Sequence, residues 1–148
     1  MNEISNKQTA NIFIIGLSYV FPGDIDTESM GASRVSVSLA AGKSWIPLYF
    51  TPGSAKLLIT ENNSFEGNSF TTDLECSLPG SNEDFDKSVR AICEKPIVLQ
   101  IILSNSDVLM LGGKKKKVRI KLKQSIDIKA GYQLLVSYTS KDMPKNLI

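Results

Sequence analysis

A two-residue alternation of apolar and polar side chains recurs along this chain and constrains its fold more than any other feature. In residues 118–123, Val, Ile and Leu alternate with Arg and Lys, and residues 70–78 alternate in a similar way. Successive side chains of a β-strand point to opposite faces, so this period is typical of strands that are buried on one face. The sequence therefore predicts a mainly β protein.

Other short segments rich in β-branched and aromatic residues raise the number of expected strands to about nine. Turn-forming Ser, Asn and Asp residues separate two of these segments, which predicts a hairpin over residues 97–111. Ile126 and Ile128 extend or precede the last strand. The expected strands are residues 12–20, 34–39, 46–50, 56–60, 70–78, 97–103, 108–111, 118–123 and 132–138.

One helix is expected over residues 83–95. Glu83 and Asp84 suit the positive end of its dipole, and Pro96 disfavours helical geometry at Lys95, where the helix must end. The candidate N-caps are Ser81 and Asn82, and the apolar stripe consists of Phe85, Val89, Ile92 and Cys93.

These elements predict an antiparallel β-sandwich or barrel with one α-helix inserted before the last hairpin. A length of 148 residues suits one domain, and no linker or internal repeat is visible. The most apolar stretch, residues 11–21, is too short to cross a bilayer, so a buried strand and no membrane span are expected. Cys76 and Cys93 lack metal-type spacing, so reduced core thiols are favoured over a disulfide, which favours synthesis inside a cell.

Catalytic chemistry has little support in this sequence. The chain contains no histidine, which excludes Ser-His-Asp and Cys-His arrangements. Asp24, Asp26 and Glu28 form a D-x-D-x-E run, but the glycine and terminal glutamate of a calcium-binding EF-hand loop are absent. Gly112 and Gly113 precede a lysine without the spacing of a phosphate-binding loop. We therefore expect no enzyme activity, no cofactor and no metal site.

Two polar segments, residues 21–33 and 61–69, are expected to be loops, yet they carry large apolar side chains. Such a loop either folds back over its own core or meets a partner. If a partner is involved, the candidate subunit-interface residues are Phe21, Ile25, Met30 and Phe65.

A run of four lysines is the sharpest charge feature in a chain whose net charge is only +2. Its two interpretations are a solvated turn that protects a sheet edge and a patch that contacts DNA phosphates; the absence of interleaved aromatic residues favours the solvated turn. Trp45 is spaced as a strand residue, which favours core packing over sugar stacking. The candidate solvent-facing or DNA-facing residues are Lys114, Lys115, Lys116 and Lys117.

The chain also resembles a class of phage proteins. Residues 43–57 (KSWIPLYFTPGSAKL), a polar loop, a strand ending in Leu78-Pro79-Gly80, a short helix and the hairpin PIVLQIILSNSDVLMLGG resemble small proteins encoded among the virion genes of phages and prophages of Bacteroidetes-type hosts. The order of strands, helix, hairpin and closing strands over residues 43–140 is similar to the tail-tube family of bacteriophages.

This resemblance implies a virion structural protein, made in the host cytoplasm, that self-assembles into a tail tube or ring. Copies would join edge strands around the ring, and the partners would be the chain itself and other virion proteins. The alternatives are a head-tail connector, a capsid decoration protein and another β-sandwich module that binds carbohydrate or protein. No catalytic or binding residue follows from the resemblance.

Overall fold

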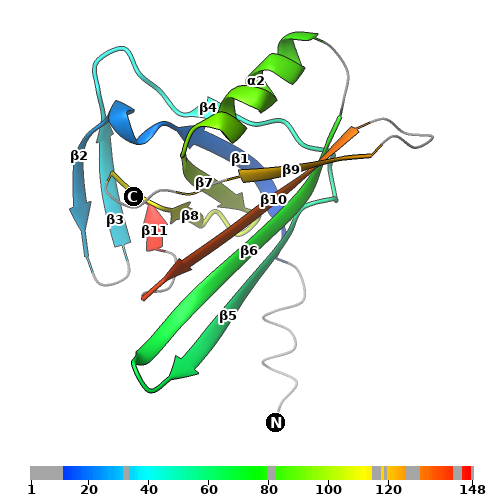
Figure 1. Ribbon diagram of the computed structural model, residues 1–148. Coiled ribbons are helices and arrows are strands. Elements are labelled where there is room, and N and C mark those ends of the chain that lie inside the picture. The colour runs from blue at the N-terminus through cyan, green and yellow to red at the C-terminus, as the bar shows by residue number, and fades with distance from the viewer. Residues whose placement is uncertain are drawn as a thin grey trace.

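Two β-sheets pack against each other, and one α-helix lies beside them (Figure 1). The computed structural model describes residues 12–31, 34–79, 83–114, 118, 120–125, 131–141 and 145–147. These residues form eleven strands and one α-helix, and neither of the sheets they build closes into a barrel. The expected mainly β fold is confirmed, and of its two forms the sandwich is the one observed.

The larger sheet has seven strands in the order β2-β3-β11-β8-β7-β1-β4. Strand β11 pairs in parallel with β3, where Asn146 lies opposite Arg34, and it pairs antiparallel with β8 on its other side. It therefore links the β2–β3 pair to the rest of the sheet. The strands are β1 (Ile14–Val20), β2 (Ile25–Met30), β3 (Arg34–Leu39), β4 (Ile46–Pro47), β7 (Val98–Leu103), β8 (Val108–Leu111) and β11 (Lys145–Leu147).

The smaller sheet has four antiparallel strands in the order β5-β6-β10-β9. Strand β6 is the longest, and it pairs with β10 from Pro79 to Phe70. Beyond Phe70, towards its N-terminal end, β6 pairs with β5 alone, up to Gly67 opposite Ser64. The strands are β5 (Lys56–Ser64), β6 (Gly67–Pro79), β9 (Ile120–Ser125) and β10 (Gly131–Ser140).

The main core lies between the two sheets. Leu99 and Ile101 of the central strand β7 are fully buried, as are Leu74 of β6 and Leu134 of β10, and all four belong to one apolar cluster. Leu74, Cys76 and Leu78 are all buried in this core, so the alternation of residues 70–78 predicted the buried face of β6 correctly. Strands β7 and β10 carry no such regular alternation, because Val98, Ile102 and Leu135 are also apolar.

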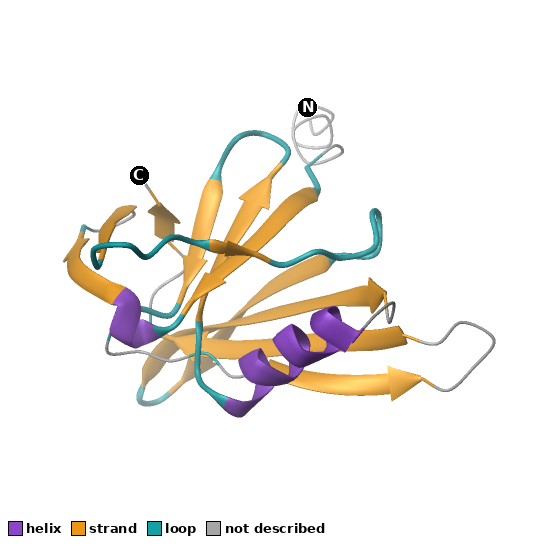
Figure 2. Ribbon diagram, turned by 90° about the horizontal axis from the view of Figure 1, so that it is seen from above, coloured by secondary structure: helices purple, strands orange, loops and turns teal. Residues whose placement is uncertain are grey.

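The helix α2 (Glu83–Glu94) adds Val89 and Ile92 to the main core, and both are fully buried. It ends one residue before Lys95, close to the expected end, while the expected caps Ser81 and Asn82 lie outside the described residues. Figure 2 shows α2 beside the strands of the smaller sheet, where it contacts β9. The β7–β8 hairpin follows the helix as expected, but it is not the last pair, because β9 and β10 form another.

A second, smaller core lies on the face of the larger sheet that points away from the main core. Strand β7 is buried on both faces, since Val98 is fully buried away from the main core while its neighbour Leu99 points into it. Trp45 packs against this second core, which agrees with the expected packing role. The buried members of the second core are Val20, Ile25, Val35, Val98 and Met110.

Several expected boundaries are corrected. The expected loop over residues 21–33 contains β2, which pairs with β3, and the expected loop over residues 61–69 is the end of the β5–β6 hairpin. The expected strand over residues 46–50 is limited to Ile46–Pro47. Strand β11 had no counterpart among the expectations. Ile126 and Ile128 lie outside the described residues.

Both cysteines are free, as expected. Cys76 is buried in the main core, and Cys93 is half-buried against it. Burial, and after it the Glu75 carboxylate, raises the pKa of the Cys76 thiol to about 12. The thiol therefore stays protonated at neutral pH, which suits an apolar core group rather than a nucleophile or metal ligand.

Candidate assembly surfaces

Of the expected interface residues in segment 21–33, Ile25 is internal and Phe21 is half-buried. Ile25 is only 2% exposed and belongs to the second core, so its expected role in a subunit contact is wrong. Phe21 is half-buried against the main core, where its ring meets Tyr19 edge-on with centroids 5.8 Å apart. Lys95 Nζ lies 5.7 Å from the centre of the same ring. Met30 is in β2, and its side chain is outside the described part of the structure.

Phe65 is different, because its side chain is fully exposed. It forms the tip of the β5–β6 hairpin together with Glu66, and the next residue, Gly67, has a φ of 121° that favours glycine. Figure 1 shows this hairpin tip projecting away from the rest of the molecule. Phe65 is thus available to a partner, and its interface role stays a prediction.

The border of the larger sheet at β1 is only partly covered. Strand β4 pairs with β1 at Tyr19 and Ser18, and the Leu48 N–H then donates to the Leu17 carbonyl at 2.8 Å. Among the described strands, none pairs with the same edge of β1 from Ile14 to Gly16. Within the described residues, this half of β1 therefore has no partner strand on that side, and such a border can pair with another chain.

An apolar hollow lies beside this open edge, and we call it the β1 hollow. Its volume is about 730 Å³, and no charged residue lines it. Phe13, Ile15 and Tyr49 around it are each more than half exposed. The lining residues are Phe13, Ile14, Ile15, Gly16, Leu17, Ser18, Pro47, Leu48, Tyr49, Phe50, Pro52, Gly53 and Ile102.

Sequence reasoning missed this surface for a clear reason. Residues 12–15 are four consecutive apolar residues, so alternation cannot tell which of them face inward. The structure buries Ile14 and exposes Phe13 and Ile15. An uninterrupted apolar run in a strand with one buried face is itself the signal, since it leaves apolar side chains on the other face.

The border of the smaller sheet at β5 is open along its whole length. Strand β5 has nine residues, pairs with β6 on one side, and has no described strand on the other. Only Lys56 and Glu61 put charges along it, and no proline interrupts it. Charges and prolines are what natural proteins place on edge strands to prevent pairing with other chains, so β5 is weakly protected.

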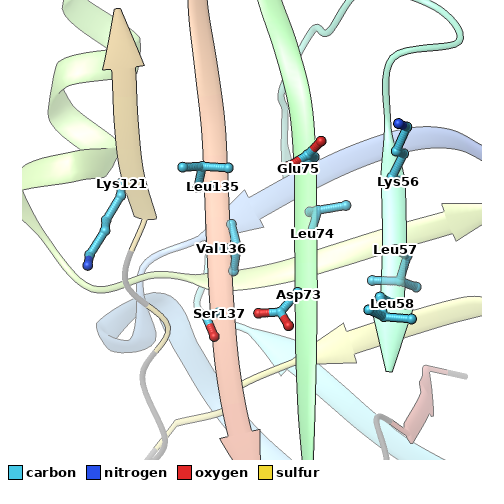
Figure 3. A pocket seen from close by; sticks show the side chains of 10 residues that line it. All are labelled: Lys56, Leu57, Leu58, Asp73, Leu74, Glu75, Lys121, Leu135, Val136 and Ser137. Carbon is cyan, nitrogen blue, oxygen red and sulfur yellow. The ribbon is translucent and has the colours of Figure 1, made fainter. Parts of the chain in front are cut away.

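A second hollow, of about 780 Å³, lies on the smaller sheet (Figure 3). Lys121, Leu135, Glu75 and Lys56 lie in one row across its four strands, and Asp73 sits beside Ser137 in the next row. Two lysines and two acids balance in charge, so this surface is unsuited to a polyanion. The described residues also contain no group of three potential metal ligands.

Lys114 is exposed, but its polar atoms are engaged within the chain. Its N–H donates to Glu28 Oε2 at 3.1 Å, and its Nζ donates to the Asp26 carbonyl at 2.9 Å. It therefore ties the segment after β8 to β2 and has a structural role beside any contact with DNA. Lys115, Lys116 and Lys117 lie outside the described residues.

The acidic D-x-D-x-E run does not converge on one point. The Asp24 carboxylate lies 3.9 Å from Lys43 Nζ, whereas Glu28 accepts from the Lys114 N–H. Asp26 is exposed and takes part through its backbone carbonyl. A calcium site needs several oxygens around one centre, and these three residues do not supply it.

Glu28 packs tightly against the glycine pair after β8. Gly112 has a φ of 85°, which favours glycine, and a Cβ on Gly113 would collide with Glu28 Oε1. That oxygen is buried and has no hydrogen-bond partner among the described atoms. Burial and then the nearby Glu28 carboxylate raise the pKa of Tyr138, while the Tyr138 hydrogen bond with Ser140 acts in the opposite direction.

Gly113→Ala is expected to lower the free energy of unfolding by about 1–2 kcal/mol, because the new methyl group displaces the Glu28 carboxylate from the Lys114 N–H. Urea unfolding measures the loss. In the double variant Gly113→Ala/Glu28→Ala the space is free, so its loss should be clearly smaller than the sum of the single losses. Additive losses would contradict this contact.

Comparison with known protein families, with characterised proteins and with solved structures gives no match to this chain. No helix within the described residues is long and apolar enough to cross a membrane. A proposal of function therefore depends on the surfaces of the chain and on the pattern of its sequence.

Proposed function

We propose that this chain is a structural subunit of a phage particle that assembles with its own copies into a ring or tube. The observation that carries the proposal is the pair of open sheet borders, the nine-residue strand β5 and the N-terminal half of β1. The resemblance of residues 43–140 to tail-tube proteins supplies the kind of particle.

Open borders favour assembly because each holds a row of backbone N–H and carbonyl groups with which a strand of another copy can pair. A heterologous contact joins two different patches, and it closes into a ring when the rotation between neighbours allows it. In such a ring, every copy offers one border and receives another. The exposed apolar side chains at the β1 hollow also favour association, because their apolar surface becomes buried when two copies meet.

The first test is the mass of the purified chain in solution. Size-exclusion chromatography with light scattering should give a mass that rises with concentration above that of one chain, and negative-stain images should show rings or tubes. No catalytic turnover is expected. A single-chain mass at every concentration would contradict self-assembly.

A head-tail connector or capsid decoration protein would behave differently in the same test. It would remain a monomer alone and would assemble only when other virion proteins are added. The carbohydrate-binding alternative loses Trp45 as a sugar-stacking residue, because Trp45 packs against the second core instead of standing on an exposed face.

A further inference from the structure

We propose that Phe65 of one copy inserts into the β1 hollow of a second copy. This inference rests on the proposed self-assembly and names the contact that orients one subunit on the next. It brings together an exposed aromatic side chain and an open apolar hollow of the same chain.

The hairpin tip is built as a projection with one apolar group at its end. Beyond Phe70, strand β6 has no pairing with β10, so residues 62–64 and 67–69 form a two-stranded ribbon. All of the other residues from 61 to 69 are Glu, Asn, Ser or Gly. Such a ribbon has no core of its own, so Phe65 does not stabilise the monomer by burial.

The β1 hollow suits an aromatic side chain. Its volume of about 730 Å³ leaves room for a phenyl ring and part of the turn that carries it. Its lining has no charged residue, and the aromatic rings of Phe13 and Tyr49 at its border are 63% and 64% exposed. Aromatic side chains prefer edge-to-face or offset contacts with one another, which these rings can provide to Phe65.

Phe65 cannot reach the hollow of its own chain. Pro52 and Gly53 line the hollow, and β5 begins shortly after them at Lys56. The nine extended residues of β5 then carry the tip roughly 30 Å from Lys56, at about 3.3 Å per residue, and Figure 1 shows the tip projecting away from the rest of the molecule. The occupant must therefore come from another molecule, and the contact is head-to-tail, so it can repeat from copy to copy.

Variants on both sides of the contact test it. Phe65→Ala should weaken association about 10- to 100-fold, as measured by sedimentation across a concentration series, because a buried aromatic anchor is lost. Phe65→Trp should retain association. Ile15→Asp, which places a charge in the hollow at a side chain that is 56% exposed, should weaken association as much as Phe65→Ala does.

Two control variants separate this contact from general effects. Glu66→Ala changes the other residue of the turn, and Ser36→Asp places a charge at an exposed position on β3, outside both the β1 hollow and the β5 border. Association of both variants should match that of the unmodified chain. Circular dichroism should show that all these variants are folded.

Photo-crosslinking then locates the contact. With p-benzoylphenylalanine in place of Phe65, irradiation should give dimers whose adduct lies in residues 13–18 or 47–53 of the other copy. If the unmodified chain assembles but the adduct falls elsewhere, or Phe65→Ala assembles normally, this contact is wrong and the proposed function stands. If the unmodified chain stays monomeric and no intermolecular adduct forms, both are wrong.

Discussion

Leu99→Ala will lower the free energy of unfolding by about 2–5 kcal/mol. Leu99 is fully buried in β7, which is flanked by β1 and β8, and it points into the core between the sheets. Removing its side chain loses transfer free energy and leaves a cavity, because strands held on both sides relax little. Chemical denaturation with a two-state fit measures the change.

The matched control for this variant is Leu58→Ala. Leu58 is 63% exposed on the edge strand β5, so the same truncation should change the free energy of unfolding by no more than about 0.5 kcal/mol. Equal losses from the two variants would contradict the placement of the main core between the sheets.

Val98→Asp will be more damaging and will prevent stable folding. Val98 is fully buried in the second core, where its described neighbours are Val20, Ile25, Val35 and Met110. A carboxylate there would be buried among these apolar side chains, and the penalty of about 4 kcal/mol or more is a large part of a typical total stability of about 5–15 kcal/mol. Soluble yield and the loss of a cooperative thermal transition measure the effect.

Ser36→Asp is the control for the second core. Ser36 is exposed on β3, next to the buried Val35, so a carboxylate at position 36 stays in water. The melting temperature of the Ser36→Asp variant should stay close to that of the unmodified chain. A folded, cooperative Val98→Asp variant would show that water reaches the face behind the larger sheet.

The sequence predicted the strands whose alternation reflects burial, and it failed where a strand has no buried face. Residues 61–64 and 67–69 are polar on both faces because they extend beyond the core, so period-2 alternation was absent although they are strands. Strand β2 lies at an edge, and four of its six residues, Asp26 to Ser29, are polar.

Strand β11 could not be predicted from local pattern at all. Three residues are too few to show a period, and their pairing with β3 and β8 depends on segments far away in the chain. Phe65 could be named as a candidate interface residue because a large apolar side chain in a polar segment is conspicuous, and the structure shows that it is exposed. The β1 hollow was missed because its residues belong to a continuous apolar run.

The position of β11 has a consequence during synthesis. The β2–β3 pair leaves the ribosome early, but its neighbour in the larger sheet, β11, is made only after β4 to β10, so these strands wait while the intervening chain is translated. A polypeptide that terminates before residue 145 would keep Val35 and Met110 accessible to water and to proteases. The larger sheet therefore becomes continuous only after translation has passed β11.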